Sequence, residues 1–193
     1  LGYYSRVRNM KKAAIAVMER HGGVFPRTYE EIRALCGIGD YTAGAIASFA
    51  FDLPYPAVDG NVMRVVTRLC AYGAPITDPA VKKEITAAVA AAQPKSAPAL
   101  FNQAMMELGA TVCLPNGAPK CTACPMAAIC AAHRAGKETD FPQKTKKAPR
   151  RVEKRTVLLL RDGARVALVK RPAKGLLAGL FEPPCLEGTY SER

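Results

Sequence analysis

The chain has 193 residues, of which 49% are hydrophobic and 23% are charged, and this balance excludes a globally disordered protein. Its 28 Lys and Arg against 16 Asp and Glu give a formal net charge of +12, which favours a polyanionic partner. No apolar run is long enough to span a bilayer and no signal-peptide pattern is present, so we expect a cytoplasmic protein with no membrane partner. The first residue is Leu and the last stretch stops within a pattern, so we expect an excerpt of a longer protein.

The N-terminal stretch is predicted to be a helix that is capped by Ser5 and ends at Gly22 or Gly23. Apolar residues recur on one face at helical spacing, namely Val7, Met10, Ala14, Val17 and Met18. The other face is basic and carries Arg6, Arg8, Lys11 and Lys12. Leu1 and Tyr3 precede this helix; such side chains normally belong to a core and more rarely wedge into a stack of bases.

A second short helix is predicted over residues 29–35, with Thr28 at its start, and a Gly-x-Gly turn follows at Gly37 and Gly39. Two helices joined by such a turn expose several backbone N–H groups at the start of the second helix, where the helix dipole also attracts anions. Glycine turns are common between helices. On a basic chain, however, the pattern predicts a helix–hairpin–helix that binds a backbone phosphate without base specificity.

Asp59 lies between a proline-containing segment and a helix predicted over residues 62–72. An aspartate at this place is most often a plain helix N-cap. A catalytic carboxylate needs the same exposed, dipole-stabilised position, so the two roles do not exclude each other. Further helices are predicted over residues 78–92 and from Ser96 onward. The last of them presents an inward stripe of core residues, Leu100 or Phe101, Met105 and Leu108.

Four cysteines fall within eighteen residues, namely Cys113, Cys121, Cys124 and Cys130. Clustered thiols in a cytosolic chain stay reduced and usually hold a metal. Four thiolates satisfy either a tetrahedral zinc ion or a cubane iron–sulfur cluster. Zinc is the weaker choice, because zinc ribbons usually offer two Cys-x-x-Cys pairs and this chain has one such pair between two single cysteines. His133 is nearby, but four cysteines already complete the set, so we interpret His133 as a surface residue.

The composition changes after the cysteines. Residues 134–155 contain prolines and a basic run, and they are predicted to be an interdomain linker that can lie along a phosphate backbone. Residues 144–155 carry seven positive side chains and one negative side chain, a net +6 that is half of the net charge of the chain. Two apolar stretches then flank Asp162 and Gly163, which predicts a β-hairpin. Residues 156–193 are therefore predicted to begin a β-containing domain.

Five motifs follow one another along the chain, namely Leu1–Asn9, Leu35–Gly39 with Tyr41–Gly44, Val58–Val62, Phe101–Gly109 and the four cysteines. Together, over essentially the whole chain, they resemble the adenine DNA glycosylases of the MutY type. This resemblance implies a monofunctional enzyme that hydrolyses the N-glycosidic bond of adenine mispaired with 8-oxoguanine or guanine in double-stranded DNA. The resemblance also implies a [4Fe–4S] cluster, whereas the cysteine spacing by itself does not identify the metal.

The resemblance implies a mainly α fold as well. Its expected parts are a helical helix–hairpin–helix glycosylase domain (1–112), an iron–sulfur cluster loop (113–133), the basic linker (134–155) and an incomplete, Nudix-like α+β domain (156–193). We expect the protein to be a monomer.

The expected site residues follow from their places in these motifs. Asp59 is expected to be the carboxylate that stabilises the positive charge developing on the deoxyribose as the bond breaks. Asn61 is expected to hold this site, and Tyr41 to pack and hydrogen-bond in it. Tyr3, with Leu1, resembles a wedge that enters the stack beside the oxidised guanine while the adenine is flipped out. Gly37 and Gly39 are expected to bind a backbone phosphate of the DNA. The cluster is expected to be held by the four cysteines, namely Cys113, Cys121, Cys124 and Cys130.

The chain departs from the family pattern in several respects, and one of them is Cys36, which stands where a proline is common. Seven residues separate the first two cluster cysteines where the family usually has six, and an insertion between Pro115 and Pro119 would absorb the difference. The family's general acid is a glutamate on a helix upstream of the Leu-Gly-Tyr-Tyr stretch, and these 193 residues lack that segment. One carboxylate cannot both stabilise the cation and protonate the leaving adenine. We therefore expect these residues alone to be inactive and the parent protein to be active.

Three alternatives remain. An endonuclease III-type glycosylase for oxidised pyrimidines shares the hairpin and the cluster. The chemistry of that family needs a lysine that forms a Schiff base, at the position where this chain has Tyr41. That family would also be expected to show Asp-Thr-His where this chain has Asp59–Asn61. A DNA-binding module could hold the metal for structure only. An electron-transfer iron–sulfur protein is disfavoured for two reasons: the cysteines suffice for one cluster only, and the chain that carries them is basic and helical.

Overall fold

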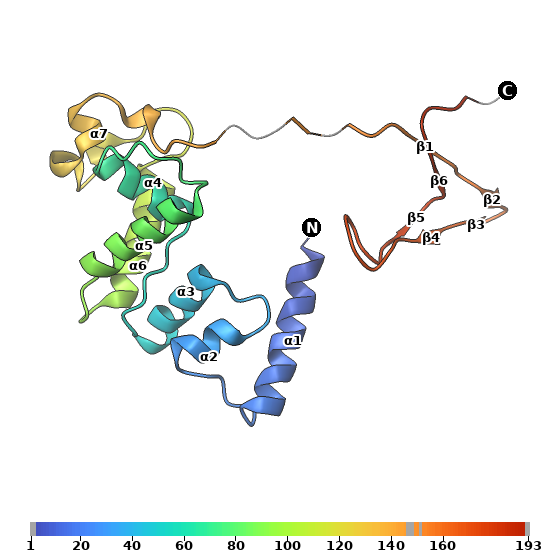
Figure 1. Ribbon diagram of the computed structural model, residues 1–193, viewed down its shortest axis with the longest axis horizontal. Helices are drawn as coiled ribbons and strands as arrows, with labels where there is room; N and C mark the ends of the chain where they lie inside the picture. The colour runs from blue at the N-terminus through green and yellow to red at the C-terminus, as the bar shows by residue number, and fades with distance from the viewer. Residues whose placement is uncertain (1–2, 146–148, 151, 192–193) are drawn as a thin grey trace. The chain divides into compact units, whose positions relative to one another are not determined.

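The computed structural model describes residues 3–145, 149–150 and 152–191 and has two compact units, Leu1–Thr145 and Lys146–Arg193 (Figure 1). The first unit is helical, as the sequence predicts. Its α-helices are α1 (Tyr4–Arg20), α2 (Tyr29–Ala34), α3 (Asp40–Phe51), α4 (Gly60–Leu69), α5 (Pro79–Ala92), α6 (Pro98–Glu107) and α7 (Ala131–Arg134). A π-helical turn, η1 (Leu108–Val112), continues α6, and short 3-10 turns follow, η2 (Cys121–Ala123), η3 (Ala127–Ile129) and η4 (Glu138–Asp140).

One core of the helical unit forms where α4 packs against α5 and α6. Its buried side chains are aliphatic, namely Val58, Val62, Val81, Ile85 and Val89. Phe101 and Met105 pack on them from α6, whereas Leu100 is 67% exposed, so the predicted inward stripe runs through Phe101. α6 starts at Pro98 instead of Ser96, because a residue before proline is pushed out of the helical region, and Ala97 has φ −151° and ψ 54°.

A buried asparagine fixes the segment that leads to Asp59. Asn102 on α6 is 1% exposed, and its Oδ1 accepts a hydrogen bond from Ala57 N at 3.1 Å. Its Nδ2 donates to Ser48 Oγ and to Tyr55 O, each at 2.9 Å. These bonds satisfy the buried polar groups of three chain segments at once, and they attach the connection between α3 and α4 to α6.

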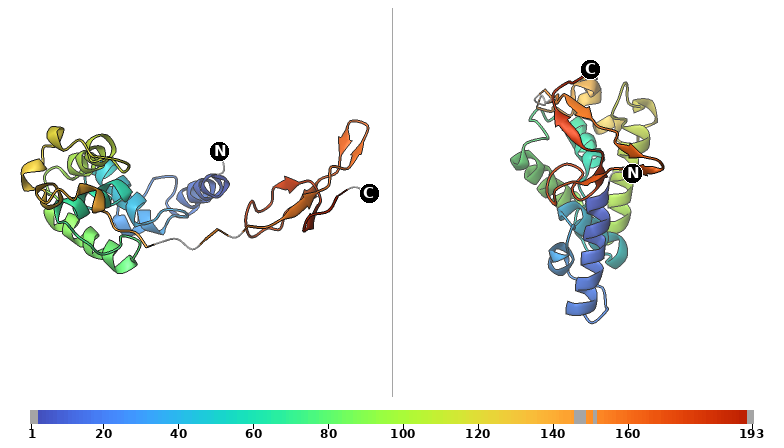
Figure 2. Two further views of the ribbon diagram at one scale, coloured as in Figure 1. Left: turned by 90° about the horizontal axis from the view of Figure 1, so that it is seen from above. Right: turned by 90° about the vertical axis from the view of Figure 1, so that its right-hand side faces the viewer.

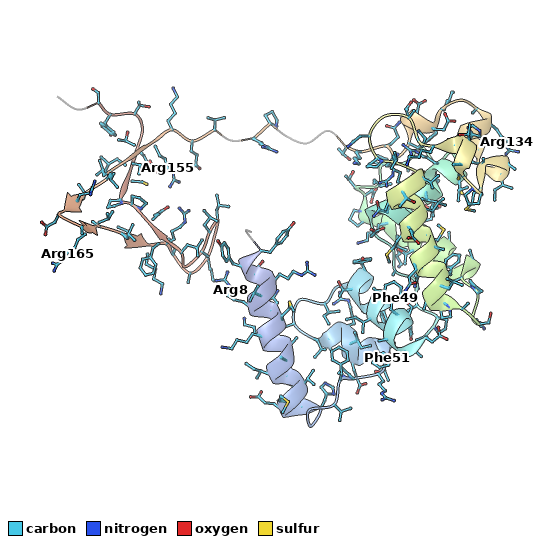
Figure 3. All side chains as sticks on the ribbon, turned by 180° about the vertical axis from the view of Figure 1, so that it is seen from behind. Arg8, Phe49, Phe51, Arg134, Arg155 and Arg165 are labelled. Carbon is cyan, nitrogen blue, oxygen red and sulfur yellow. The ribbon has the colours of Figure 1, made fainter. Side chains whose placement is uncertain are left out.

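α1 differs from the prediction in its start and in its packed face. Tyr3 is the N-cap residue, so Ser5 lies inside the helix and does not cap it. The half-buried positions of α1 are Asn9, Ala13, Ala16 and Val17. Three residues of the predicted apolar face, Val7, Met10 and Met18, are at least 64% exposed. Arg8, labelled in Figure 3, is also exposed on this helix. α1 has 17 residues, and no helix in the described part of the chain is long and apolar enough to cross a membrane.

The second unit consists of short antiparallel strand pairs, drawn as arrows in Figure 2. β1 (Arg155–Val157) pairs with β6 (Cys185–Glu187), β2 (Arg161–Asp162) with β3 (Arg165–Val166), and β4 (Val169–Lys170) with β5 (Phe181–Glu182). The predicted hairpin is present, but Asp162 pairs with Arg165, so its turn residues are Gly163 and Ala164. Gly163 has φ +55°, which glycine adopts without strain and which explains the shift by one residue. None of the described residues of this unit is buried.

Residues 134–145 belong to the helical unit, although composition placed them in the linker. Arg68 Nε on α4 donates to Phe141 O at 3.0 Å, and Ile76 N donates to Gln143 O at 3.0 Å. These hydrogen bonds attach the segment after α7 to the helices, so the boundary between the two units lies later than the change in composition.

Candidate functional site

Asp59 is the N-cap residue of α4, and its carboxylate is held by three hydrogen bonds. Oδ1 accepts from Asn61 N at 2.8 Å and from Val62 N at 2.9 Å, and Oδ2 accepts from Asn61 Nδ2 at 2.8 Å. The first two bonds satisfy N–H groups that an α-helix leaves unpaired at its start, and the helix dipole favours the negative charge there. The predicted capping role is therefore confirmed, and the carboxylate is oriented on a rigid helix.

Arg64 extends this network into the interior. It is 7% exposed, and its Nη2 donates to Asn61 Oδ1 at 2.9 Å and to Gly109 O at 2.6 Å. Its Nε donates to Cys113 O at 2.7 Å. Burial lowers the pKa of the Arg64 guanidinium, and the nearby Cys113 opposes this shift. Arg64 thus links the residue beside the candidate carboxylate to the first cysteine. Sequence reasoning missed it, although an arginine three positions after Asn61 on an inward helix face was a usable signal.

The end of α6 supports both Asn61 and Tyr41. A Cβ on Gly109 would lie 2.7 Å from Asn61 Cβ, so only glycine permits this close approach of η1 to α4. One turn earlier, Met106 Sδ lies 4.0 Å from Tyr41 Oη. Tyr41 is 39% exposed. The two residues expected beside the sugar therefore contact neighbouring turns of the same helical segment.

The Gly-x-Gly turn joins α2 to α3 as the sequence predicts. Gly37 has φ +83°, and a Cβ on it would lie 2.6 Å from Asn9 Cβ of α1. Gly39 is the N-cap residue of α3, and a Cβ on it would meet no atom within 4 Å. The first turn of α3 therefore begins on an open side of the hairpin, where its unpaired N–H groups suit an anion. Arg33 Nη1 donates to Ile38 O at 3.1 Å and braces the turn from α2.

The two expected wedge residues lie at the start of the chain. Tyr3 immediately precedes α1 and is 72% exposed, so it is accessible to a partner. Leu1 lies outside the described residues. The basic side of α1 follows directly after Tyr3, and its cationic residues Arg6, Arg8, Lys11 and Lys12 are all exposed.

The four cysteines line one cavity at the end of α4, together with the apolar residues Val65, Leu108 and Val112. None of the four forms a disulfide. A [4Fe–4S] cluster needs four thiolates around one apolar site, and this donor set fits it. Arg68 and Lys120 also border the cavity, and their positive charge offsets the negative charge of four thiolates. Although seven residues separate the first two cysteines, all four cysteines line the same cavity.

Arg68 contacts two of these cysteines and was also missed by sequence reasoning. It is 3% exposed, and its Nη1 donates to Cys113 Sγ at 3.3 Å and to Leu114 O at 2.9 Å. Its carbonyl accepts from Cys130 Sγ at 3.4 Å. One helix, α4, therefore carries the capping carboxylate at its start and braces the cysteine loop at its end.

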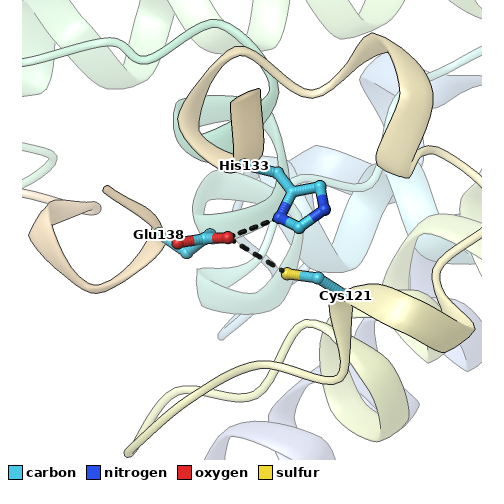
Figure 4. A group of neighbouring side chains, drawn as sticks. All are labelled: Cys121, His133 and Glu138. Carbon is cyan, nitrogen blue, oxygen red and sulfur yellow. Dashed lines mark hydrogen bonds and ion pairs between the residues drawn. The ribbon is translucent and has the colours of Figure 1, made fainter. Parts of the chain in front are cut away.

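His133 is partly exposed, in keeping with the sequence-based interpretation, but it also contacts other side chains. Its Nδ1 lies 2.5 Å from Glu138 Oε1, and the same oxygen accepts from Cys121 Sγ at 3.7 Å (Figure 4). All three residues are partly buried. The His133 bond lowers the pKa of Glu138, whereas burial, with a contribution from Glu138, raises the pKa of the Cys121 thiol. The interaction was not visible in the sequence, because η4 folds back onto α7 after Gly136.

The chain is similar to known proteins along its whole length. A helix-hairpin-helix motif model matches residues 20–49. An adenine DNA glycosylase of Homo sapiens is 35% identical over 239 residues, which cover 100% of this chain and 44% of that protein. The adenine DNA glycosylase of Arabidopsis thaliana is 41% identical over 198 residues, which cover 95% of this chain and 31% of that protein.

Solved structures of DNA glycosylases share the fold. A non-covalent complex of endonuclease III with DNA superposes with a TM-score of 0.59 at 28% identity and covers 69% of this chain and 60% of that one. A thermostable thymine-DNA glycosylase gives a TM-score of 0.58 at 27% identity, with 68% of this chain and 59% of that one covered. The chain spans less than half the length of the human and plant relatives that it matches. Along its whole sequence the chain is therefore similar to adenine DNA glycosylases of the MutY type, and its α2 and α3 form the helix–hairpin–helix that the motif model describes.

Proposed function

We propose that the complete protein is a monofunctional adenine DNA glycosylase of base-excision repair. Its substrate is double-stranded DNA with adenine opposite 8-oxoguanine or guanine, and its reaction is hydrolysis of the N-glycosidic bond. The observation that carries this proposal is the Asp59 carboxylate, held at the start of α4 by Asn61 N, Val62 N and Asn61 Nδ2. The similarity to adenine DNA glycosylases supports the choice of base.

Asp59 acts by charge. As the bond between the sugar and adenine breaks, positive charge develops on the deoxyribose, and a fixed carboxylate stabilises it. Asn61 and Arg64 keep the carboxylate oriented, so little reorganisation is needed during the reaction. Water then adds to the sugar carbon, and the leaving adenine takes a proton. That proton must come from a second acid, because Asp59 works in its ionised form.

Tyr41 favours this reaction over the endonuclease III alternative. A Schiff-base mechanism needs an amine at this position, and a phenol cannot form that covalent bond. Tyr41 instead contacts Met106 with its hydroxyl and leaves part of its ring exposed. It can therefore pack against the extruded nucleotide beside Asp59.

DNA binding is assigned to the turn at Gly37 and Gly39, with the exposed basic side of α1 next to it. The start of α3 would bind a backbone phosphate through its unpaired N–H groups. Tyr3, together with Leu1, is the proposed wedge beside the oxidised guanine, a role that its exposure supports. We assign the strand pairs of residues 155–187 to the beginning of a Nudix-like domain, and we expect the protein to act as a monomer.

The four cysteines would hold a [4Fe–4S] cluster, which supplies a rigid cross-link between the segments around Cys113 and Cys130 when it is bound. Arg68 Nη1 donates to Cys113 Sγ, a bond that a thiolate can accept, so this residue positions one of the ligands from α4. In this arrangement the cluster loop supports the same helix that carries Asp59.

Substitution of Asp59 by asparagine in the complete protein tests the proposal. Asparagine caps helices about as well as aspartate, but the bond from Asn61 Nδ2 loses its acceptor, so we expect the free energy of unfolding to fall by about 1 kcal/mol. Removal of the charge should lower the single-turnover rate of adenine release at least about a hundredfold while DNA affinity is kept. Asp78→Asn is a matched control, because Asp78 Oδ1 caps α5 by accepting from Ala80 N at 2.8 Å and lies outside the site.

Two results would contradict the proposal. Unchanged adenine release by Asp59→Asn would leave this residue only its capping role and would favour a non-catalytic DNA-binding module. A covalent protein–DNA adduct trapped by borohydride would favour the endonuclease III-type reaction instead.

A further inference from the structure

Cys121, His133 and Glu138 form a cluster of metal-ligating side chains that line the four-cysteine cavity (Figure 4). They come from η2, α7 and η4, and their ligand atoms all lie within 4.8 Å of one another. One thiol, one imidazole and one carboxylate therefore face the same small volume. This set shares one cysteine with the proposed cluster site and otherwise uses residues that the cluster does not need.

The chemistry of the three ligands is that of a zinc site. Zinc binds sulfur at about 2.3 Å and nitrogen or oxygen at about 2.0 Å in tetrahedral geometry, which places S and O about 3.5 Å apart. Cys121 Sγ and Glu138 Oε1 are already 3.7 Å apart. His133 Nδ1 and Glu138 Oε1 are 2.5 Å apart and would separate to about 3.3 Å, as an ion replaces the hydrogen that now joins them.

The backbone holds His133 and Glu138 in place without help from the cysteine thiols. Gly136 N donates to His133 O at 3.0 Å, and Lys137 N donates to Ala132 O at 2.9 Å. Ala132 is fully buried, so α7 is anchored next to the turn that carries Glu138. Backbone hydrogen bonds therefore position the imidazole and the carboxylate for one another in the chain without iron.

We propose that the cluster-free protein binds one Zn²⁺ through Cys121, His133 and Glu138. Cys121 releases its thiol proton to solvent, His133 binds through Nδ1 with its hydrogen on Nε2, and Glu138 binds as a carboxylate. The two negative ligands balance the ion, and water or a further thiolate completes the tetrahedron. Because Cys121 belongs to both sets, zinc and the cluster exclude each other. This inference goes beyond the proposed function and does not depend on adenine excision.

Cobalt(II) titration of the iron-free chain under reducing conditions tests the proposal, with zinc then added as competitor. We expect one equivalent of Co²⁺ to give tetrahedral d–d absorption with weak thiolate charge transfer, and one equivalent of Zn²⁺ to displace it. His133→Ala and Glu138→Gln should each weaken binding at least about tenfold. His21→Ala and Cys70→Ser are matched controls, because these residues lie outside the set, and they should change nothing.

The iron and sulfide content of reconstituted His133→Ala distinguishes a lost ligand from a misfolded loop. We expect it to equal that of the unsubstituted chain, since four cysteines remain. The proposal is overturned if metal affinity is unchanged in both variants, if charge transfer reports four thiolates, or if His133→Ala loses its capacity for the cluster as well. A failure of adenine excision by the complete protein would leave the zinc titration unaffected, so the two proposals fail separately.

Discussion

At the scale of single residues, the site depends on a buried cation that contacts three acceptors. Arg64 donates to Asn61 Oδ1, Gly109 O and Cys113 O, and it is 7% exposed. Hydrogen bonds from a charged donor are stronger than neutral ones, and buried acceptors that lose their donor are costly. Arg64 therefore contributes both to stability and to the orientation of the residue beside Asp59.

Arg64→Met should lower the free energy of unfolding by about 2–4 kcal/mol, because the buried acceptors lose their donor. In the complete protein, adenine release should also slow, since Asn61 Oδ1 loses the donor that orients its side chain toward Asp59. Urea denaturation and single-turnover kinetics measure the two effects. Arg20→Met at the exposed end of α1 is the control, with an expected change within about 0.5 kcal/mol. Equal effects of the two substitutions would contradict this assignment.

Two glycines near Asp59 should respond differently to alanine. A Cβ on Gly109 would lie 2.7 Å from Asn61 Cβ, so Gly109→Ala should cost about 1–3 kcal/mol of stability and displace Asn61. A Cβ on Gly60 would meet no atom within 4 Å, so Gly60→Ala should keep or slightly raise stability. Chemical denaturation of both variants checks this order, and a more damaging Gly60→Ala would reverse it.

At the scale of elements, the helix–hairpin–helix separates the folding role of one glycine from the binding role of the other. Gly37 adopts a left-handed conformation against Asn9, whereas Gly39 caps α3 on its open side. The pattern Gly-x-Gly therefore combines a residue needed for the turn with a residue that leaves room for a phosphate.

Gly37→Ala should destabilise the protein by about 1–2 kcal/mol from backbone strain, and the contact with Asn9 adds to this cost. Gly39→Ala should lower the free energy of unfolding by less than about 1 kcal/mol, since alanine is a poorer N-cap than glycine. It should weaken DNA binding, because its methyl group would stand where a phosphate approaches. Thermal unfolding and fluorescence anisotropy with a DNA duplex separate the two effects. Normal DNA affinity in Gly39→Ala would argue against phosphate binding at this turn.

At the scale of the whole molecule, much of the positive charge lies in one short stretch of the sequence. Residues 144–155 carry seven positive side chains and one negative one, half of the net +12. Lys144, Arg150 and Lys154 are exposed among them. Phosphate contacts by such residues release counterions from DNA, so their contribution is measurable as a salt dependence.

Replacement of Lys144, Arg150 and Lys154 together by glutamine should make the slope of log affinity against log salt shallower by up to about 3 units. Matched and mismatched duplexes should be affected alike, since phosphate contacts carry no base information. Replacement of Lys95, Lys170 and Lys174, which are also exposed, removes the same charge from other parts of the chain and serves as control. If the slope of log affinity against log salt became shallower by the same amount in both triple variants, net charge alone would determine the salt dependence. The segment would then have no special role in DNA binding.

Local patterns were sufficient for the parts of the fold that depend on neighbouring residues. The turn at Gly37 and Gly39, the N-cap roles of Thr28, Asp59 and Asp78, and the helical nature of the first unit all follow from short-range chemistry. Errors occurred where a cap or a face depends on tertiary contacts. Ser5 lies within α1, Ser96 precedes α6 without capping it, and Val7, Met10 and Met18 of the apolar face predicted for α1 are exposed.

The sequence by itself determined the helix–hairpin–helix, the capping carboxylate and the cysteine set, because each is encoded within a few consecutive residues. Only the tertiary structure decided that Arg64 joins Asn61 to Cys113 and that Arg68 donates to Cys113 Sγ. The same holds for the contact of His133 with Glu138. Arg64 and Cys113 are 49 positions apart, and Arg68 and Phe141 are 73 apart. Contacts of this kind depend on how helices pack, and no local pattern of polarity or spacing specifies them.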